Sequence, residues 1–283
     1  MTMKKLVFLF LLSILLAAAV GTARAEDFDH SAWDRVVKKY VTETGRVDYA
    51  ALKADRADLD RYVAQIAARS PVSHPQDFPT RESQLAYWIN AYNALVLHAV
   101  VEHWPTKSVR DIGKLPYSFF WRKKFVAGGR KYTLNAIEGD FLRKQLAEPR
   151  IHFALVCAAN SCPRLERQAH TAQNVERLLE ANSRFYMNEP RNLKIEAARN
   201  RVTIARIFTF YREDFENYVR AKGISGSGQP VLDYIRLYLT DENRRALDAL
   251  KKPKVDDFEY DWGINDVNAP VATGHSATKE ERP

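Results

Sequence analysis

The chain of 283 residues has two cysteines, and both lie in the stretch RIHFALVCAANSCPRL together with one of its seven histidines. Four residues separate Cys157 from Cys162, which is enough for the chain to fold back to the Cα separation of about 4.4–6.8 Å that a disulfide needs. A disulfide across a loop of this length stabilises by roughly 2 kcal/mol in the chain-entropy model. The spacing differs from the C-x-x-C of redox motifs. We therefore expect a structural disulfide, with a redox-active pair as the alternative.

The same stretch contains the parts of a thiol catalyst, with Cys157 as nucleophile and His152 as base. The short apolar run over residues 151–157 predicts a buried strand. Five residues of a strand span about 16 Å, and an odd spacing places two side chains on opposite faces. Because a nucleophile and its base must lie about 3 Å apart, a regular strand excludes this pair.

Cys162 offers a second thiol geometry, because it precedes Pro163 and proline is frequent at the first position of a helix. The N-terminus of a helix that begins there would stabilise a thiolate on Cys162. His152, His98 or His170 would then supply the base from elsewhere in the fold.

The segment RESQLAYWINAYNALVLHAVVEHW predicts a long helix whose apolar residues cover nearly the whole circumference, as in a buried central helix. Asn90 and Asn93 share a face of it. Buried amides need hydrogen-bond partners, so we expect a polar cluster at a binding pocket, formed by these two residues and His152 and lined by Tyr87 and Trp88. Papain-like and transglutaminase-like hydrolases carry their nucleophile on a helix of this kind, but no cysteine occurs in this one.

Glu138 has two interpretations. With Asn135 as the N-cap, Glu138 occupies the third helical position and completes an arrangement like a capping box. The alternative places Glu138 in the binding pocket, as a partner of His152.

No metal and no cofactor are expected. The sequence has no H-x-x-x-H, H-E-x-x-H or doubled C-x-x-C motif, and no phosphate loop or dinucleotide fingerprint. The acidic cluster near the C-terminus lacks the spacing of an EF-hand, and its alternation favours a solvated strand face. This cluster comprises Asp256, Asp257, Glu259 and Asp261.

Hydrophobic periodicity predicts a single α+β domain over residues 26–267, helix-rich, with the buried central helix packed on a small mixed or antiparallel sheet. A polar tail over 268–283 is expected to be disordered. Helices are expected over 33–41, 59–66, 81–104 (with Thr80 as N-cap), 137–146, 171–187, 208–219, 230–239 and a segment ending near 251. Hairpins are expected over 124–134, turning at Gly128-Gly129, and over 193–207, with a final extended segment over 258–262.

Residues 1–25 have the features of a signal peptide. Lys4 and Lys5 precede an apolar run over residues 6–20, and Ala23-Arg24-Ala25 supplies the small residues of a cleavage site. The run is short for a membrane-spanning helix, which needs about 20 residues. We expect a cut after Ala25 and a periplasmic or secreted product without a transmembrane span.

Charge gives a weak signal about partners. The formal net charge of +8 falls to +5 when the three basic residues of the leader are removed. We expect no nucleic-acid partner, because an exported protein without a concentrated basic stripe is not typical of that class.

Several blocks of the sequence resemble one family in the same order: YWINAYNALVLHAV, TLNAIEGDFLR, RIHFALVCAANSCPRL, YREDF and YDWGIN. The family is domain of unknown function 547. The resemblance is strongest between about residues 80 and 220, and its bacterial members are typically exported. Some plant members lack the second cysteine of the pair, and some carry a glutaredoxin-like domain. The resemblance implies no established reaction.

Two functional hypotheses follow. The first is an exported binding or interaction module with a Cys157–Cys162 disulfide, acting on an unidentified small molecule, peptide or envelope protein. The second is a thiol-dependent enzyme, either a hydrolase or acyl transferase or an oxidoreductase, with Cys162 or Cys157 as nucleophile and a histidine as base.

Overall fold

The computed structural model describes residues 28–224 and 226–270. The predicted signal peptide and most of the predicted disordered tail lie outside these residues. None of the described helices is long and apolar enough to cross a membrane.

The described residues form an α+β fold in which helices dominate and the strands make two small sheets. The helices are α2 (Ser31–Tyr40), α3 (Tyr49–Ala54), α4 (Ala57–Ala68), α5 (Arg81–Glu102), α6 (Ser118–Trp121), α7 (Leu134–Ala136), α8 (Val175–Asn188), α9 (Ile207–Phe210), α10 (Arg212–Ala221), α11 (Pro230–Arg236) and α12 (Asp241–Asp248). A π-helix, η3 (Ile137–Gln145), continues α7. Short 3-10 helices are η1 (Pro75–Asp77), η2 (Val109–Asp111), η4 (Pro149–Phe153) and η5 (Ala197–Arg199). The strands are β1 (Phe125–Ala127), β2 (Arg130–Tyr132), β3 (Leu193–Glu196), β4 (Arg201–Ile204) and β5 (Lys254–Asp257).

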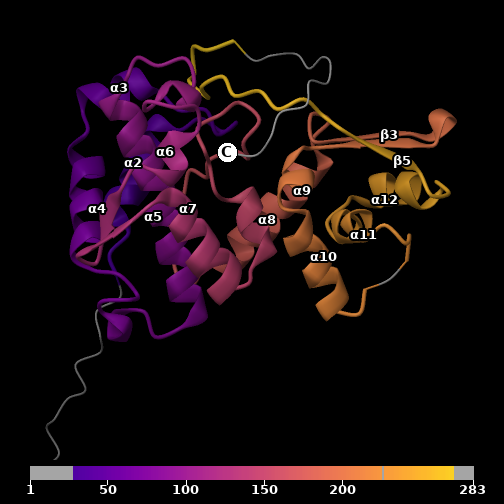
Figure 1. Cartoon of the computed structure of the whole chain (residues 1–283), viewed down its shortest axis with the longest axis horizontal. Coiled ribbons are helices and arrows are strands. Elements are labelled where there is room, and N and C mark those ends of the chain that lie inside the picture. Colours follow the sequence, from indigo (N-terminus) through magenta and orange to yellow (C-terminus); the bar gives the residue numbers. More distant parts are fainter. Residues whose placement is uncertain (1–27, 225, 271–283) are drawn as a thin grey trace, which may run out of the picture.

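The core consists of two hydrophobic clusters. The larger one joins the helices from α2 to α7, which lie at one end of the molecule, and the smaller one joins α9 to α12 with β3 to β5 at the other end (Figure 1). The side chains of α8 contribute to both clusters. The seam between the clusters is where the candidate site lies.

Helix α5 forms the centre of the larger cluster, as the sequence predicts. Thr80 caps α5 in a capping box. Its hydroxyl accepts from the backbone N–H of Ser83, and the Ser83 hydroxyl accepts from the backbone N–H of Thr80. Sixteen residues of α5 are buried, and it packs chiefly against α3, α4, η3 and α8. Burial on all sides explains its weak amphipathic character.

Both predicted hairpins are confirmed. In the first, Ala127 pairs with Arg130 across Gly128-Gly129, and both glycines have positive φ, a region that favours residues without a Cβ atom. In the second, β3 and β4 pair antiparallel, and β5 adds to β4 in parallel. The three-stranded sheet is therefore mixed.

Two local predictions are wrong. Residues 151–157 do not form a strand: η4 occupies the first part, because Pro149 is fixed at its start and the Glu148 side chain accepts from the Arg150 N–H as a cap. Asn135 is not an N-cap: Thr133 caps the helix two residues earlier, with its hydroxyl accepting from the Ala136 N–H. The segment over 258–262, predicted to be extended, follows the strand β5 and is not helical.

Candidate functional site

A cavity of about 300 Å³ lies at the seam between the two core clusters. Its walls come from α5, α6, α7 and η3 on one side and from α9 and the C-terminal segment on the other. The loop after η4 also contributes. The lining residues are Tyr92, Phe120, Asn135, Glu138, Gly139, Arg143, His152, Leu155, Cys157, Cys162, Pro163, Ile207, Phe210, Tyr211, Tyr260 and Trp262.

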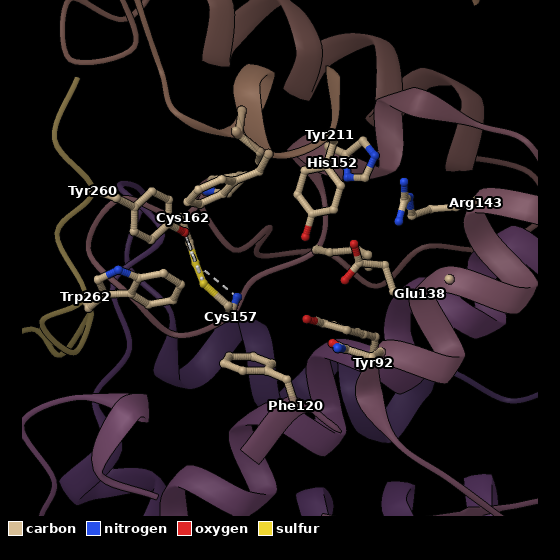
Figure 2. A pocket seen from close by; sticks show the side chains of 16 residues that line it. Tyr92, Phe120, Glu138, Arg143, His152, Cys157, Cys162, Tyr211, Tyr260 and Trp262 are labelled. Carbon is tan, nitrogen blue, oxygen red and sulfur yellow. Dashed lines mark hydrogen bonds between the residues drawn. A yellow bond between two sulfur atoms is a disulfide. The ribbon is translucent and has the colours of Figure 1, made fainter. Parts of the chain in front are cut away.

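A disulfide forms one wall of the cavity (Figure 2). The Cα atoms of Cys157 and Cys162 are 6.2 Å apart, and the backbone N–H of Cys157 donates to the Cys162 sulfur at 3.1 Å. Burial raises the pKa of Tyr260, so its hydroxyl keeps its proton at neutral pH. Because disulfide sulfurs carry no hydrogen, this hydroxyl is the donor in its contacts of 3.3 Å with Cys157 and 3.4 Å with Cys162.

On the opposite side of the cavity, His152 and Arg143 both bind the carboxylate of Asp214. The His152 Nε2 donates to Oδ2 of Asp214 at 2.7 Å, and Arg143 binds the same carboxylate in a bidentate manner at 2.6 and 2.9 Å. Burial alone would raise the pKa of Asp214, but the hydrogen bonds from His152 and Arg143 lower it to about 2. The imidazole also stacks on the Tyr211 ring, with centroids 3.8 Å apart. His152 is thereby held in one orientation.

Glu138 points into the cavity between two tyrosines (Figure 2). Its residue is only 7% exposed, and among the described residues no lysine, arginine or histidine lies within ion-pair distance of it. Burial, and then the neighbouring Glu138, raise the pKa values of Tyr92 and Tyr211 well above the ordinary value. Both phenols therefore stay protonated and face the Glu138 side chain across the cavity (Figure 2).

The two predicted helix asparagines position loops rather than line this cavity. The Asn93 side chain accepts from the Val156 N–H and donates to the Ala154 carbonyl, both at 2.9 Å. It thus fixes the loop that leads from His152 to Cys157. Asn90 clamps His170 in the same way, accepting from its backbone N–H at 3.0 Å and donating to its carbonyl at 2.7 Å.

Tyr87 and Trp88 are also core residues. The Tyr87 hydroxyl donates to the Arg69 carbonyl at 2.7 Å, and Trp88 stacks on Phe141 with ring centroids 4.1 Å apart. The structure therefore brings His152, Cys157 and Cys162 to one cavity. The four predicted pocket residues of α5 do not line it.

Glu138 is not a capping residue. Because the helix begins at Leu134, Glu138 lies beyond the first turn, and its side chain is free to face the cavity. The interpretation that placed Glu138 in the pocket with His152 agrees with this geometry. His152, however, binds Asp214 rather than Glu138.

The histidine bases considered for a thiol enzyme are distributed over the fold. Among the described residues no hydrogen bond joins His152 to either sulfur. The His98 ring bonds to Arg56 at 2.9 Å, and His170 is buried beside Asn90. No helix begins at Pro163, since α8 starts only at Val175. The proposed helix N-terminus for a Cys162 thiolate is therefore absent.

Sequence patterns did not predict Tyr211, Tyr260 and Trp262, which line the cavity, or Asp214, which binds His152. Tyr211 and Asp214 lie in YREDF, and Tyr260 and Trp262 lie in YDWGIN. Both blocks carried the resemblance to the family, which was the available signal. Within residues 28–224 and 226–270, no group of three or more histidine, cysteine or acidic residues could hold a metal ion.

These features define a helix-rich α+β domain with an aromatic-walled cavity at the seam of its core. A family model described as protein of unknown function, DUF547, matches residues 75–187. The matched region includes Glu138, His152 and both cysteines, whereas Asp214 and Tyr260 lie beyond it. No curated protein and no solved structure matches the chain.

Proposed function

We propose that the chain is an exported binding domain whose cavity takes a small organic cation with an apolar or aromatic body. The observation that carries this proposal is Glu138, a buried carboxyl group that faces the cavity without a cationic partner among the described residues. Buried carboxylates are costly unless paired, so a ligand that supplies an ammonium or guanidinium group would compensate that cost.

The walls support the same class of ligand. The rings of Phe120, Tyr260 and Trp262 surround the cavity (Figure 2), and aromatic faces attract cations as well as apolar groups. The hydroxyl groups of Tyr92 and Tyr211 provide the few polar contacts that fix a ligand's orientation. Arg143 also lines the cavity and is paired with Asp214. Glu138 contributes to raising the Arg143 pKa, but no ion pair joins the two side chains, so the Glu138 carboxyl can still accept a direct contact from a ligand.

The test is thermal unfolding of the purified chain with tyramine, and with 4-ethylphenol as an analogue that lacks the ammonium group. A ligand that binds only the folded state stabilises it by about 2.7 kcal/mol at a hundredfold excess over Kd, which raises the Tm by several degrees. We expect tyramine to raise the Tm and 4-ethylphenol to have little effect. Glu138→Gln should abolish the difference. Asp140→Asn is the matched control, because Asp140 is exposed on the same helix and pairs with Lys144.

If tyramine and 4-ethylphenol act equally on the wild-type chain, or if Asp140→Asn behaves like Glu138→Gln, the cationic ligand class is wrong. If neither compound binds, a second cation such as choline is tested before the cavity is abandoned. Failure with both cations contradicts the proposal.

The thiol-dependent enzyme remains the second candidate, because Cys157, Cys162 and His152 line the same cavity. Reduction would expose two thiols beside the Tyr260 hydroxyl. Alkylation with and without prior reduction, read by mass spectrometry, separates the candidates. A thiol that alkylates rapidly below pH 7 favours the enzyme, and cysteines that stay blocked until reductant is added favour the binding domain.

Export is part of the proposal and rests on the first 25 residues. Expressed with this leader in a Gram-negative host, the chain should be recovered from the periplasm with the mass of a product beginning at Glu26. Recovery of the uncut chain from the cytoplasm contradicts export.

A further inference from the structure

Contrary to the expectation from overall charge that no basic stretch stands out, positive charge is concentrated in one segment of the chain. Residues 107–132 contain eight lysines and arginines and a single acidic residue, Asp111. The segment therefore carries a formal charge of +7, whereas the expected mature chain carries +5. The remainder of that chain is slightly acidic, so the basic character of the protein comes from this segment.

Most of this charge is unpaired and in solvent. Arg110 lies over the Tyr117 ring, and Lys123 pairs with Glu102 at 2.9 Å. The other six basic side chains are exposed and have no ion-pair partner within the described part of the chain: Lys107, Lys114, Arg122, Lys124, Arg130 and Lys131.

Large apolar side chains are exposed in the same segment. Leu115 is 47% exposed, Trp121 40% and Val126 38%, and the two other exposed large apolar residues among those described, Val72 and Phe185, are each 37% exposed. Three of these five therefore lie in this one segment. The Arg122 guanidinium lies 4.5 Å from the centroid of the Trp121 ring, and Val126 pairs with Lys131 across the β1–β2 hairpin, where both are exposed. We call these residues, with Lys124 and Arg130, the basic–apolar surface; what they share is their exposure and their nearness in the chain.

The fold presents this surface rather than burying it. Within α6, Phe119 and Phe120 are buried and anchor the helix, while the adjacent Trp121 faces solvent. In β1, Phe125 and Ala127 face the core and Val126 faces outward. The exposed aromatic and aliphatic groups are therefore held on rigid, buried neighbours.

We propose that the basic–apolar surface binds a lipid bilayer that contains anionic phospholipid. Lysine and arginine side chains near such a bilayer are attracted to its negative surface potential, and tryptophan favours the boundary between headgroups and acyl chains. An acidic protein partner fits less well, because the centres of protein interfaces are depleted in lysine. Here basic residues stand next to each exposed apolar side chain.

The proposal is independent of the cavity ligand, although the two sites meet at α6. Phe120 lines the cavity, and Trp121 beside it belongs to the basic–apolar surface. A chain bound in this way would hold that wall of the cavity next to the bilayer.

The test is sedimentation with vesicles of phosphatidylcholine alone and of phosphatidylcholine with about 30 mol % phosphatidylglycerol. The chain used begins at Glu26, which retains every residue that the structure describes and removes the apolar leader. We expect binding to the anionic vesicles only, weakening as salt rises from about 0.1 to about 0.5 M.

The variant Lys124→Gln/Arg130→Gln/Lys131→Gln should lower the partition coefficient about a hundredfold, because each basic residue contributes roughly fivefold. The matched control is Lys222→Gln/Arg245→Gln/Lys251→Gln, which removes the same charge from exposed positions. These lie in the part of the chain around α10 and α12, away from α6 (Figure 1). The control should change binding less than twofold.

Trp121→Phe is a conservative second variant that keeps the proposal testable if the triple variant unfolds. Brominated lipids should quench part of the tryptophan fluorescence of the wild-type chain and much less of this variant. Of the four other tryptophans, Trp33, Trp88 and Trp262 are buried and Trp104 is partly buried against the core. Absence of vesicle binding, equal loss in both triple variants, or quenching that persists in Trp121→Phe overturns the proposal. Equally tight, salt-sensitive binding to polyglutamate would assign the surface to acidic polypeptides instead and would also overturn it.

Discussion

Nε2 of His152 lies 2.7 Å from Oδ2 of Asp214, although 62 positions separate the two residues in the chain. The contact connects η4, whose side chains contribute to both core clusters, to α10, which belongs to the smaller cluster. Arg143 completes it from η3. The Asp214 carboxylate therefore connects α10 to both η4 and η3 beside the cavity.

Asp214→Asn should destabilise the fold at neutral pH. The folded-state pKa of Asp214 is about 2, against about 3.9 for an unfolded chain. Its ionised form therefore contributes about 2 kcal/mol, which is fully present above pH 4 and is lost as pH falls toward 2. Urea unfolding of the wild type and the variant should show this difference at pH 7 and a smaller one at pH 3.

The control for Asp214 is Asp248→Asn, which breaks an exposed pair with Arg236. Exposed pairs contribute about 0–1 kcal/mol, so this variant should remain close to the wild type. Equal stability of Asp214→Asn and the wild type at pH 7 would show that the chain does not depend on this carboxylate.

His170, which is buried, and His30, whose side chain is half-buried, should make the fold sensitive to mild acid. Burial lowers the pKa of His30 to about 4 and that of His170 to about 3, against about 6.5 in an unfolded chain. The unfolded state therefore binds more protons below about pH 6.5, and stability is lost as pH falls through this range. Each histidine contributes up to about 1.4 kcal/mol per pH unit.

The measurement is the free energy of unfolding in urea between about pH 6.5 and 5. The wild type should lose stability steadily over this window, and His170→Gln should show a shallower slope because one titrating group is removed. A wild-type stability that is constant over the window would contradict the buried, neutral state of these rings.

Local sequence signals predicted the elements with strong periodicity or turn chemistry. Thr80 before a long apolar segment gave the start of α5, and Gly128-Gly129 gave the first hairpin. Both signals act over a few residues, where capping and positive φ decide the conformation. The disulfide was predictable for the same reason, since its two cysteines are close in the chain.

Contacts between distant segments could not be predicted in this way. The apolar run that begins at Ile151 is compatible with a strand or a helix. Pro149, whose fixed φ suits the first position of a helix, favours the 3-10 helix η4. Glu138 was assigned to a cap because Asn135 and Thr133 are both capable N-caps, and only the structure shows that Thr133 is used. No local pattern connects Asp214 or Tyr260 to His152 and the cysteines.

Asn93→Ala should destabilise the loop that carries the cavity residues. The side chain satisfies the buried Val156 N–H and Ala154 carbonyl, and each unsatisfied buried group costs about 1–3 kcal/mol. We expect a loss of about 2–4 kcal/mol in urea unfolding. Hydrogen exchange of the Val156 amide should accelerate more than that of amides in α12.

The comparison for Asn93 is Asn217→Ala, an exposed position on α10, which should change stability by less than about 0.5 kcal/mol. If both asparagine variants are equally stable, Asn93 does not hold this loop, and the position of Cys157 relative to His152 must be set by other contacts.

Removing the disulfide should weaken the fold without abolishing it. Cys157→Ser/Cys162→Ser releases a loop of six residues, which corresponds to about 2 kcal/mol. The remaining contacts of the loop, chiefly through Asn93, should keep it in place, so the variant should still bind tyramine if the cavity is a binding site. A variant that unfolds less readily than the wild type would contradict a stabilising role for the bond.

The same variant separates the two candidate functions. In the binding domain, the sulfurs only form a wall beside Tyr260, so serines leave Glu138 and the aromatic rings in place and ligand affinity changes little. In the thiol enzyme, the sulfurs are the reacting atoms, and reduced wild type but not the serine variant would modify an electrophile that enters the cavity. We expect a conserved tyramine-induced rise in Tm together with no covalent labelling of the unreduced wild type by iodoacetamide. Covalent labelling without reductant would make the enzyme the better assignment.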